Sequence, residues 1–187
     1  MKPAEAWPAA GVLLLRLARL AIAEVLGAAA DAAADEPWLR RSGASFVTLR
    51  RDGRLRGCIG TVRAFRPLGD DVRGNAVAAA LRDPRFPPLS GGELPSTAIE
   101  VSLLSALAPV AAASEEEAVA RLRPRIDGVL LEAELWRATF LPQVWEELPE
   151  PRSFLRQLRR KAGLPGDAWP KGTRLWRFTV RKIAEVS

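Results

Sequence analysis

The single cysteine of the chain, Cys58, is the residue best suited to nucleophilic chemistry, and it lies in the segment Leu55–Gly60 (LRGCIG). Side chains alternate between the two faces of a strand, so Arg56, Cys58 and Gly60 are expected on one face. A neighbouring guanidinium can stabilise a thiolate. Glycine weakens a strand unless another backbone or a ligand must approach closely. The pattern therefore predicts a contact segment, with Cys58 as its candidate catalytic residue.

A second interpretation of Cys58 is purely structural. Free cysteine is among the most buried residue types and often acts as a small hydrophobe. The chain also has no histidine that could act as the base for a thiol. A contact role for the segment without covalent chemistry is therefore favoured over a nucleophilic role for Cys58.

Three charged residues outside this segment are further candidates. Glu100 lies in an otherwise apolar stretch, where it could be an acid–base group or, as we favour, the ion-pair partner of Arg56. Asp83 and Arg85 lie in a proline-rich stretch and could either line a binding site or form a local ion pair in an Asp-Pro turn. The predicted ligand-binding residues are Leu55, Arg56, Gly57, Cys58, Ile59, Gly60, Asp83, Arg85 and Glu100.

Positive charge is concentrated in one part of the chain. The whole chain carries +6, whereas the segment 40–66 contains eight arginines and one acid, Asp52, and so carries about +7. Such a segment could contact phosphates from a β-ribbon. Hairpin tips are also often charged for solubility, and Phe46 is the only aromatic residue near the hairpin arginines, so a base-stacking platform is not indicated.

The composition excludes several chemistries. With no histidine, no tyrosine and one cysteine, the chain cannot build a Ser-His-Asp triad, a histidine metal site, an intrachain disulfide or a CxxC motif. We expect no metal and no cofactor. Arg16, Arg19 and Glu24 interrupt the apolar N-terminal run, so neither a signal peptide nor a membrane span is indicated. A cytoplasmic location without membrane contact is expected.

The elements that must position Cys58 can be read from turn and strand signals. SFVTLRR (45–51) and LRGCIGT (55–61) are typical of strands, and Asp52-Gly53 between them predicts a type I′ hairpin. With a regular ladder, Arg51 would face Arg54, Leu49 would face Arg56, and Val47 would face Cys58. Both faces would be partly apolar, which favours a sheet that is covered on both sides or lines a cleft on one.

The remaining chain alternates between helices and strands. Helices are expected near the N-terminus up to Gly27 and over 67–82, after a Ser114 N-cap, and over 142–148 and 153–161, the last ending at Gly163. Strands are expected over 99–105, 127–133, 137–141 and 173–182. This order predicts an α+β fold with mainly antiparallel strands.

The motif LRGCIG (55–60) resembles the signature of the AMMECR domain family, protein A of the AmmeMemoRadiSam system. Other similar segments follow in order and spacing over residues 10 to 182, including SFVTLRRDGRLRGCIGT (45–61), PLGDDVRGNAVAAALRDPRFPPL (67–89), ELPSTAIEVSLLS (93–105), FLPQV (140–144) and KAGLPGDAW (161–169). The chain departs from the family pattern at Arg121–Trp136, where the family commonly has a glycine-rich turn and this chain has Glu132-Ala-Glu-Leu-Trp136.

The resemblance implies a two-lobed domain with a cleft between the lobes and LRGCIG facing that cleft. The expected larger lobe is about 8–108 and 173–187, and the smaller inserted α+β lobe is about 109–172. It implies a binding or accessory domain that holds a large or anionic ligand, such as nucleic acid, a nucleotide or a protein, in the cleft. The alternative is an enzyme or enzyme subunit that uses Cys58 in a pathway with Memo-like and radical-SAM proteins. A protein-interaction module is a third hypothesis.

Overall fold

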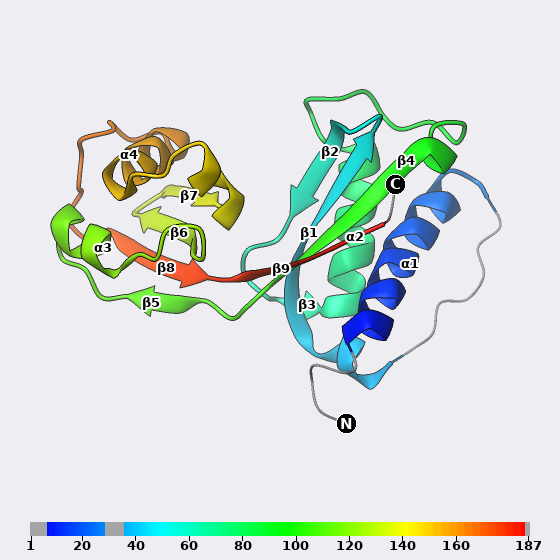
Figure 1. Cartoon of the computed structure of the whole chain (residues 1–187), viewed down its shortest axis with the longest axis horizontal. Coiled ribbons are helices and arrows are strands. Elements are labelled where there is room, and N and C mark those ends of the chain that lie inside the picture. Colours follow the sequence, from blue (N-terminus) through cyan, green and yellow to red (C-terminus); the bar gives the residue numbers. More distant parts are fainter. Residues whose placement is uncertain (1–6, 29–35, 186–187) are drawn as a thin grey trace. The chain divides into compact units, whose positions relative to one another are not determined.

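The computed structural model describes residues 7–28 and 36–185, which form two units with an antiparallel sheet each (Figure 1). Unit 1 comprises the described residues of Met1–Leu104 and Arg181–Ser187, and unit 2 comprises Ser105–Val180. Both units combine helices with strands, so the predicted α+β class is confirmed.

Unit 1 contains the LRGCIG strand. Its elements are α1 (Trp7–Val25), η1 (Pro37–Arg40), β1 (Ser42–Arg51), β2 (Arg54–Gly60), β3 (Arg66–Pro67), α2 (Leu68–Leu81), η2 (Leu94–Ser96), β4 (Thr97–Leu104) and β9 (Val180–Ala184). The strands are ordered β2-β1-β4-β9, and β3 pairs with the beginning of β1. The strand that bears Cys58 therefore lies at one side of the sheet, next to β1.

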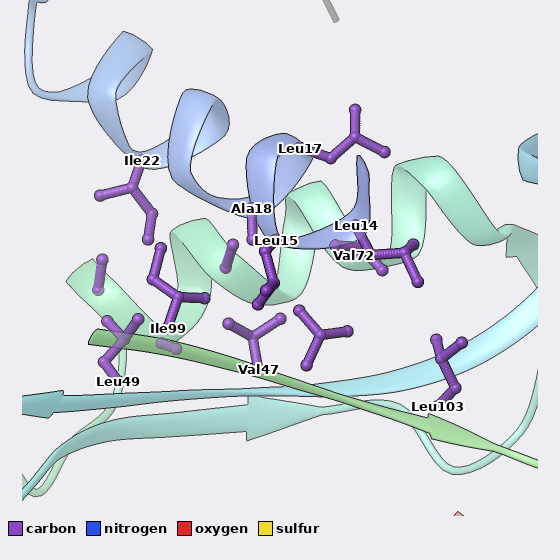
Figure 2. Packing of buried hydrophobic residues seen from close by; sticks show 14 of the residues in the cluster. Leu14, Leu15, Leu17, Ala18, Ile22, Val47, Leu49, Val72, Ile99 and Leu103 are labelled. Atoms are coloured by element: carbon purple, nitrogen blue, oxygen red, sulfur yellow. The ribbon is translucent and has the colours of Figure 1, made fainter. Parts of the chain in front are cut away.

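One face of this sheet is the apolar core of unit 1. Figure 2 shows α1 and α2 on the same side of β1 and β4, with the apolar side chains between them. Val47, Leu49 and Ile99 are buried there together with Leu14 and Ile22 of α1. Alternation along β1 sends the intervening side chains to the opposite face, which we call the outer face and define by Phe46, Thr48 and Arg50. Burial of one face fixes the register of the strands, because a slip by one residue would exchange the two faces.

Unit 2 has its own sheet and core. Its elements are β5 (Ala108–Val110), α3 (Glu115–Arg121), β6 (Gly128–Ala133), β7 (Trp136–Phe140), η3 (Pro142–Glu146), α4 (Pro151–Ala162) and β8 (Arg174–Phe178), with the strand order β5-β8-β6-β7. Trp145 and Phe154 are fully buried and stack with ring centroids 3.7 Å apart. Trp145 donates its indole N–H to the carbonyl of Asp127 at 2.7 Å, so its polar atom is satisfied inside the core.

Local signals in unit 2 give the expected ends of its helices. Ser114 caps α3 by accepting from the backbone N–H of Glu117 at 3.3 Å. Gly163 ends α4 with φ 89°, a left-handed conformation that glycine adopts without strain. At the point where the sequence departs from the family pattern, Glu134 and Leu135 form a two-residue turn in which Glu134 takes φ 51°.

Two expected elements differ from the structure. The single strand expected over 173–182 is two strands, β8 and β9, which pair in different sheets. The helix expected over 142–148 is a 3-10 helix that ends at Glu146. The first difference is decided by strand pairing, because β8 pairs with β5 and β6 whereas β9 pairs with β4.

The hairpin that carries LRGCIG is only partly regular. Asp52 (φ 51°) and Gly53 (φ 71°) both have positive φ, as a type I′ turn requires, and Arg51 faces Arg54 as predicted. A bulge then shifts the register, so that Leu49 faces Gly57 and Val47 faces Ile59. The predicted pairs of Leu49 with Arg56 and of Val47 with Cys58 are therefore wrong, because β2 contains one extra residue there.

Candidate functional site

Regular strand alternation predicted that Arg56 shares one face of β2 with Cys58 and Gly60. The bulge breaks this alternation before Cys58, so Arg56 leaves that face. The Arg56 guanidinium donates to both carboxylate oxygens of Glu93, at 3.2 and 3.3 Å, and to the carbonyl of Pro87 at 2.9 Å. These bonds, followed by one from the backbone N–H of Ser90, lower the pKa of Glu93 to about 2. Arg56 therefore ties β2 to the segment that follows α2. The predicted ion pair of Arg56 with Glu100 is wrong.

Cys58 is held through all three of its polar atoms. It faces Thr48 on the outer face, and the Thr48 hydroxyl donates to its sulfur at 3.3 Å. Its backbone N–H donates to Asp83 at 2.8 Å, and its carbonyl accepts from Arg85 at 3.3 Å. The side chain is half-buried. The fold thus places the thiol in one fixed position without sealing it in the core.

Asp83 and Arg85 form a tight pair along the free edge of β2. Arg85 donates to the buried Asp83 carboxylate from Nε at 2.9 Å and from Nη2 at 2.7 Å. The bond from Arg85 holds the pKa of Asp83 well below its usual range, against the opposing effect of burial. The pKa of Arg85 is raised, chiefly by Asp83 and to a smaller extent by Cys58. Arg85 is therefore the cation beside the thiol, where the sequence had indicated Arg56.

Arg85 has donor capacity left after these bonds. Its side chain is 54% exposed, and among the described residues its Nη1 has no hydrogen-bond partner. The local ion pair and the site-lining role, which the sequence left as alternatives, are compatible, because the pair with Asp83 uses only Nε and Nη2. A fixed guanidinium edge beside a half-buried thiol can bind a carboxylate or phosphate oxygen.

The two glycines of the motif serve close packing inside unit 1. A Cβ on Gly57 would collide with the carbonyl of Ala79 in α2, so the helix backbone lies directly against β2 there. A Cβ on Gly60 would collide with the ring of Phe46, which stands opposite on β1. Both glycines position Cys58 by allowing these contacts.

The other predicted site residues are divided between the two faces. Ile59 packs against the apolar core, whereas Leu55, opposite Arg50, is 37% exposed. Glu100 is on β4 and faces Thr48 of β1, and its Oε1 lies 3.3 Å from the ammonium of Lys182. Cys58, Thr48 and Glu100 thus form one row across β2, β1 and β4 on the outer face.

The sequence did not single out Thr48, Glu93 or Lys182. Thr48 could be found only from the correct register, which the bulge changes. Glu93 and Lys182 are separated from their partners by long stretches of sequence, and no local pattern joins them.

The structure also changes the interpretation of the positive charge in segment 40–66. Glu93 binds both Arg51, at 3.0 Å, and Arg56, and the buried Asp71 binds Arg66 at 2.9 Å. Acids from outside 40–66 therefore pair with three of its arginines, which weakens the case for a continuous phosphate-binding surface.

No group of three or more His, Cys, Asp or Glu side chains that could hold a metal occurs within residues 7–28 and 36–185. Over the same residues, the helices are too short or too polar to cross a membrane.

The fold and motif define a class of two-unit α+β proteins with a thiol-bearing strand held by an Asp-Pro-Arg segment, and comparison gives the family. The AMMECR1 family profile matches residues 15–183, so the chain belongs to the AMMECR1 family. A protein of Thermofilum pendens is 38% identical over 192 residues, which span 95% of this chain and 90% of that protein. A protein of Methanothermobacter thermautotrophicus is 36% identical over 180 residues, 94% of each chain.

A solved structure has the same fold. The crystal structure of the uncharacterized protein PH0010 from Pyrococcus horikoshii matches with a TM-score of 0.82 and 33% identity, over 92% of this chain and 89% of that one. The binding cleft that the resemblance implies stays a prediction, and the site described above lies within unit 1.

Proposed function

We propose that the chain is a binding protein that holds an anionic group, a carboxylate or a phosphate, against Cys58 on unit 1. The observation that carries this proposal is the state of Arg85: it is fixed by Asp83, borders Cys58 and keeps Nη1 without a hydrogen-bond partner among the described residues. A guanidinium whose position is already fixed loses little conformational freedom on binding an anion.

The single cysteine makes this proposal directly testable. Iodoacetate and iodoacetamide both alkylate a thiolate with loss of iodide, and they differ in that only iodoacetate is an anion. Their rate ratio on the native protein is divided by the ratio on the denatured chain, which removes the intrinsic difference between the reagents. We expect the normalised ratio to favour iodoacetate several-fold at low salt and to fall as salt screens Arg85.

The variant Arg85→Gln should reduce the normalised ratio to about one, and Arg85→Lys should retain part of the preference. Arg54→Gln is the matched control, since Arg54 is an exposed arginine of the same hairpin and borders neither Asp83 nor Cys58. A native ratio that is unchanged in Arg85→Gln would refute the anion contact. Loss of the preference in Arg54→Gln would also refute it, because the cause would then be the general charge of the hairpin.

Competition tests the size of the ligand. Inorganic phosphate, a nucleoside monophosphate and a short oligonucleotide are each added during alkylation. Protection by the two small anions at equal concentration supports a local anion site. Protection by the oligonucleotide alone would instead support the polyanion version, in which Arg50 and Arg54 of the hairpin also contact phosphates.

A second candidate function is an enzyme, or a subunit of one, with Cys58 as the nucleophile. The observation that favours it is the Thr48 hydroxyl, which donates to the Cys58 sulfur at 3.3 Å while the backbone of Cys58 is fixed on the other side. Rapid alkylation of the native protein at neutral pH would support this role. Alkylation that requires denaturation would exclude it, because a nucleophile must reach its substrate in the folded state.

The family resemblance adds a proposal about partners. Memo-like and radical-SAM proteins are proposed to act with this chain. Co-purification of the wild-type chain with each of them, and of an Arg85→Gln chain as the comparison, tests whether the site contributes to an assembly.

A further inference from the structure

A second site lies on the outer face of the unit 1 sheet, at the end where the β1–β2 hairpin turns. A pocket of about 730 Å³ is present there. It is bordered by Arg50 and Asp52 of the hairpin, Pro95 before β4, Ala98 and Glu100 of β4, and Ala184 of β9. Its volume lies within the range of small-molecule sites. Neither Cys58 nor Arg85 lines it.

Small residues create the hollow. Ala98 faces Arg50 across the β1–β4 ladder, so its methyl group lies on the outer face. Ala184 borders the same pocket from β9. The methyl groups of Ala98 and Ala184 are shorter than the side chains of Arg50 and Glu100, so they form the apolar floor of the pocket.

In the wall toward α1, the charges of Arg19 and Glu185 are paired with each other. Arg19 donates to Glu185 from Nε at 2.8 Å and to the carbonyl of Thr97 at 2.7 Å. Glu185 in turn accepts from the backbone N–H of Ile99 at 2.9 Å. Because these charges satisfy each other, this wall shapes the pocket and leaves the recognition of charge to other residues.

Outside this wall, Arg50, Asp52 and Glu100 are the charged residues that line the pocket. Among the described residues, Arg50 makes one long contact, from Nη1 to the carbonyl of Gly53 at 3.4 Å. Glu100 contacts Lys182 through Oε1, and its Oε2 has no partner among the described residues. The pocket therefore presents a guanidinium and a carboxylate oxygen that have bonding capacity left.

The register sets the spacing between the strand positions that carry these two side chains. Arg50 faces Ala98 and Thr48 faces Glu100, so Arg50 and Glu100 are diagonal neighbours across two strands. Diagonal cross-strand neighbours are about 7–8 Å apart. The structure contains no ion pair between Arg50 and Glu100, so a molecule with an anionic and a cationic group a few ångströms apart can lie between them.

We propose that this pocket binds a small zwitterion of the amino-acid type. Arg50 takes the carboxylate, Glu100 takes the ammonium group, and the floor of Ala98 and Ala184 accepts the apolar part of the ligand. The charge pattern distinguishes this ligand from the simple anion proposed for Arg85, and the two proposals use different residues.

The experiment uses the full chain and commercial probes. Pools of the twenty L-amino acids are screened by saturation-transfer NMR, and the best binder is titrated by calorimetry together with its N-acetyl and carboxamide derivatives. We expect saturable binding of the zwitterion, and a loss of at least about tenfold for each derivative, because each removes one of the two charge contacts.

Variants connect the binding to the pocket. Arg50→Gln and Glu100→Gln should each weaken binding at least about tenfold, whereas Arg54→Gln, on the same hairpin but outside the pocket, should not. Ala98→Leu fills the floor without changing the charge and should abolish binding. If Ala98→Leu does not fold, Ala184→Leu replaces it, because Ala184 is exposed.

Several results would overturn the proposal. These are no saturable binding of any amino acid at millimolar concentrations, equal binding of the N-acetyl derivative, or a loss in Arg54→Gln as large as in Arg50→Gln. The iodoacetate test on Cys58 is independent of all three, so failure here and failure of the Arg85 anion site are distinguishable.

Discussion

Two aspartate clusters in unit 1, around Asp71 and Asp83, share the same hydrogen-bond geometry. They differ in the exposure of the arginine that each aspartate binds. Asp71 accepts from the backbone N–H of Ser45 at 2.8 Å and from Nε of Arg66 at 2.9 Å. Asp83 accepts from the backbone N–H of Cys58 at 2.8 Å and from Nε of Arg85 at 2.9 Å. In each case a buried carboxylate joins a strand backbone to an arginine.

The surroundings of Asp71 are closed. Its carboxylate also accepts from the Ser45 hydroxyl at 2.7 Å and from the Asn75 amide at 3.0 Å, and Asn75 in turn accepts from Arg66 at 3.2 Å. Arg66 donates to this cluster from Nε and Nη2, whereas its Nη1 has no hydrogen-bond partner among the described residues. These bonds enclose the Asp71 carboxylate, which is fully buried, and stabilise the packing of α2 on β1.

The surroundings of Asp83 are open. Arg85 is 54% exposed, against 31% for Arg66, and the strand residue it borders is the half-buried Cys58 in place of a buried serine. A buried aspartate that binds a strand backbone and an arginine therefore does not by itself indicate a functional site. What distinguishes the Cys58 cluster is the greater exposure of its guanidinium and the position of that guanidinium next to a thiol.

The largest expected effect is on stability, from the closed cluster. Asp71→Ala leaves the backbone N–H of Ser45 without its acceptor and Arg66 without its ion-pair partner, and it should lower the free energy of unfolding by about 3–5 kcal/mol. Denaturant unfolding followed by circular dichroism measures this. The control Asp70→Ala changes the exposed neighbour in α2 and should cost less than about 1 kcal/mol. Equal losses in both variants would contradict a structural role for the cluster.

A smaller loss of stability, together with a change in reactivity, is expected from the open cluster. Asp83→Asn retains an acceptor for the Cys58 N–H but removes the charge that fixes Arg85, so unfolding should become easier by about 1–3 kcal/mol. The normalised preference of Cys58 for iodoacetate should fall at the same time, because Arg85 is no longer held. Asp70→Asn is the matched control. A stable Asp83→Asn protein with full anion preference would show that Asp83 does not position Arg85.

The pKa of Asp83 predicts a difference in acid stability. Because Arg85 holds this pKa below the ordinary value of about 3.9, the unfolded chain binds more protons as the pH falls below about 5. The contribution of Asp83 is therefore present above this range and lost as the pH decreases. Unfolding free energies between pH 5 and pH 2 should fall less steeply in Asp83→Asn, by up to about 1.4 kcal/mol per pH unit.

The cause of this pH dependence can be tested separately. In Arg85→Gln the Asp83 carboxyl loses the side-chain bond that lowers its pKa most but keeps the backbone bond from Cys58, so the slope should flatten in part. An Arg85→Gln protein that keeps the wild-type slope would assign the effect to another group.

Local rules predicted much of the frame around these clusters. Asp52-Gly53 specified the hairpin turn, Ser114 specified the start of α3 and Gly163 the end of α4, because each feature depends on a few neighbouring residues. The proline-rich stretch after the helix predicted for 67–82 marked Asp83 and Arg85 as candidates for lining a binding site. The structure brings Cys58, Asp83 and Arg85 into contact through the edge of β2.

The contacts of Arg56 could not be predicted in this way. A bulge adds one residue to a ladder without any change in residue type that would mark it, yet it turns Arg56 away from Cys58 and places Thr48 opposite the thiol. The acids bound by Arg56 and Arg66 are likewise set by tertiary packing. The charge of a segment therefore says little about its exposed potential until its partners elsewhere in the chain are known.

The smallest expected effect concerns the hydrogen bond from Thr48 to the sulfur of Cys58. Thr48→Val keeps the shape of the side chain and removes the hydroxyl that donates to Cys58, so the free energy of unfolding should change by less than about 1.5 kcal/mol. A hydroxyl donor binds a charged sulfur more strongly than a neutral one, and the thiolate is the reacting form. Alkylation at neutral pH should therefore slow several-fold for both reagents, with their ratio unchanged. A change in the ratio would instead mean that Thr48 acts through the position of Arg85.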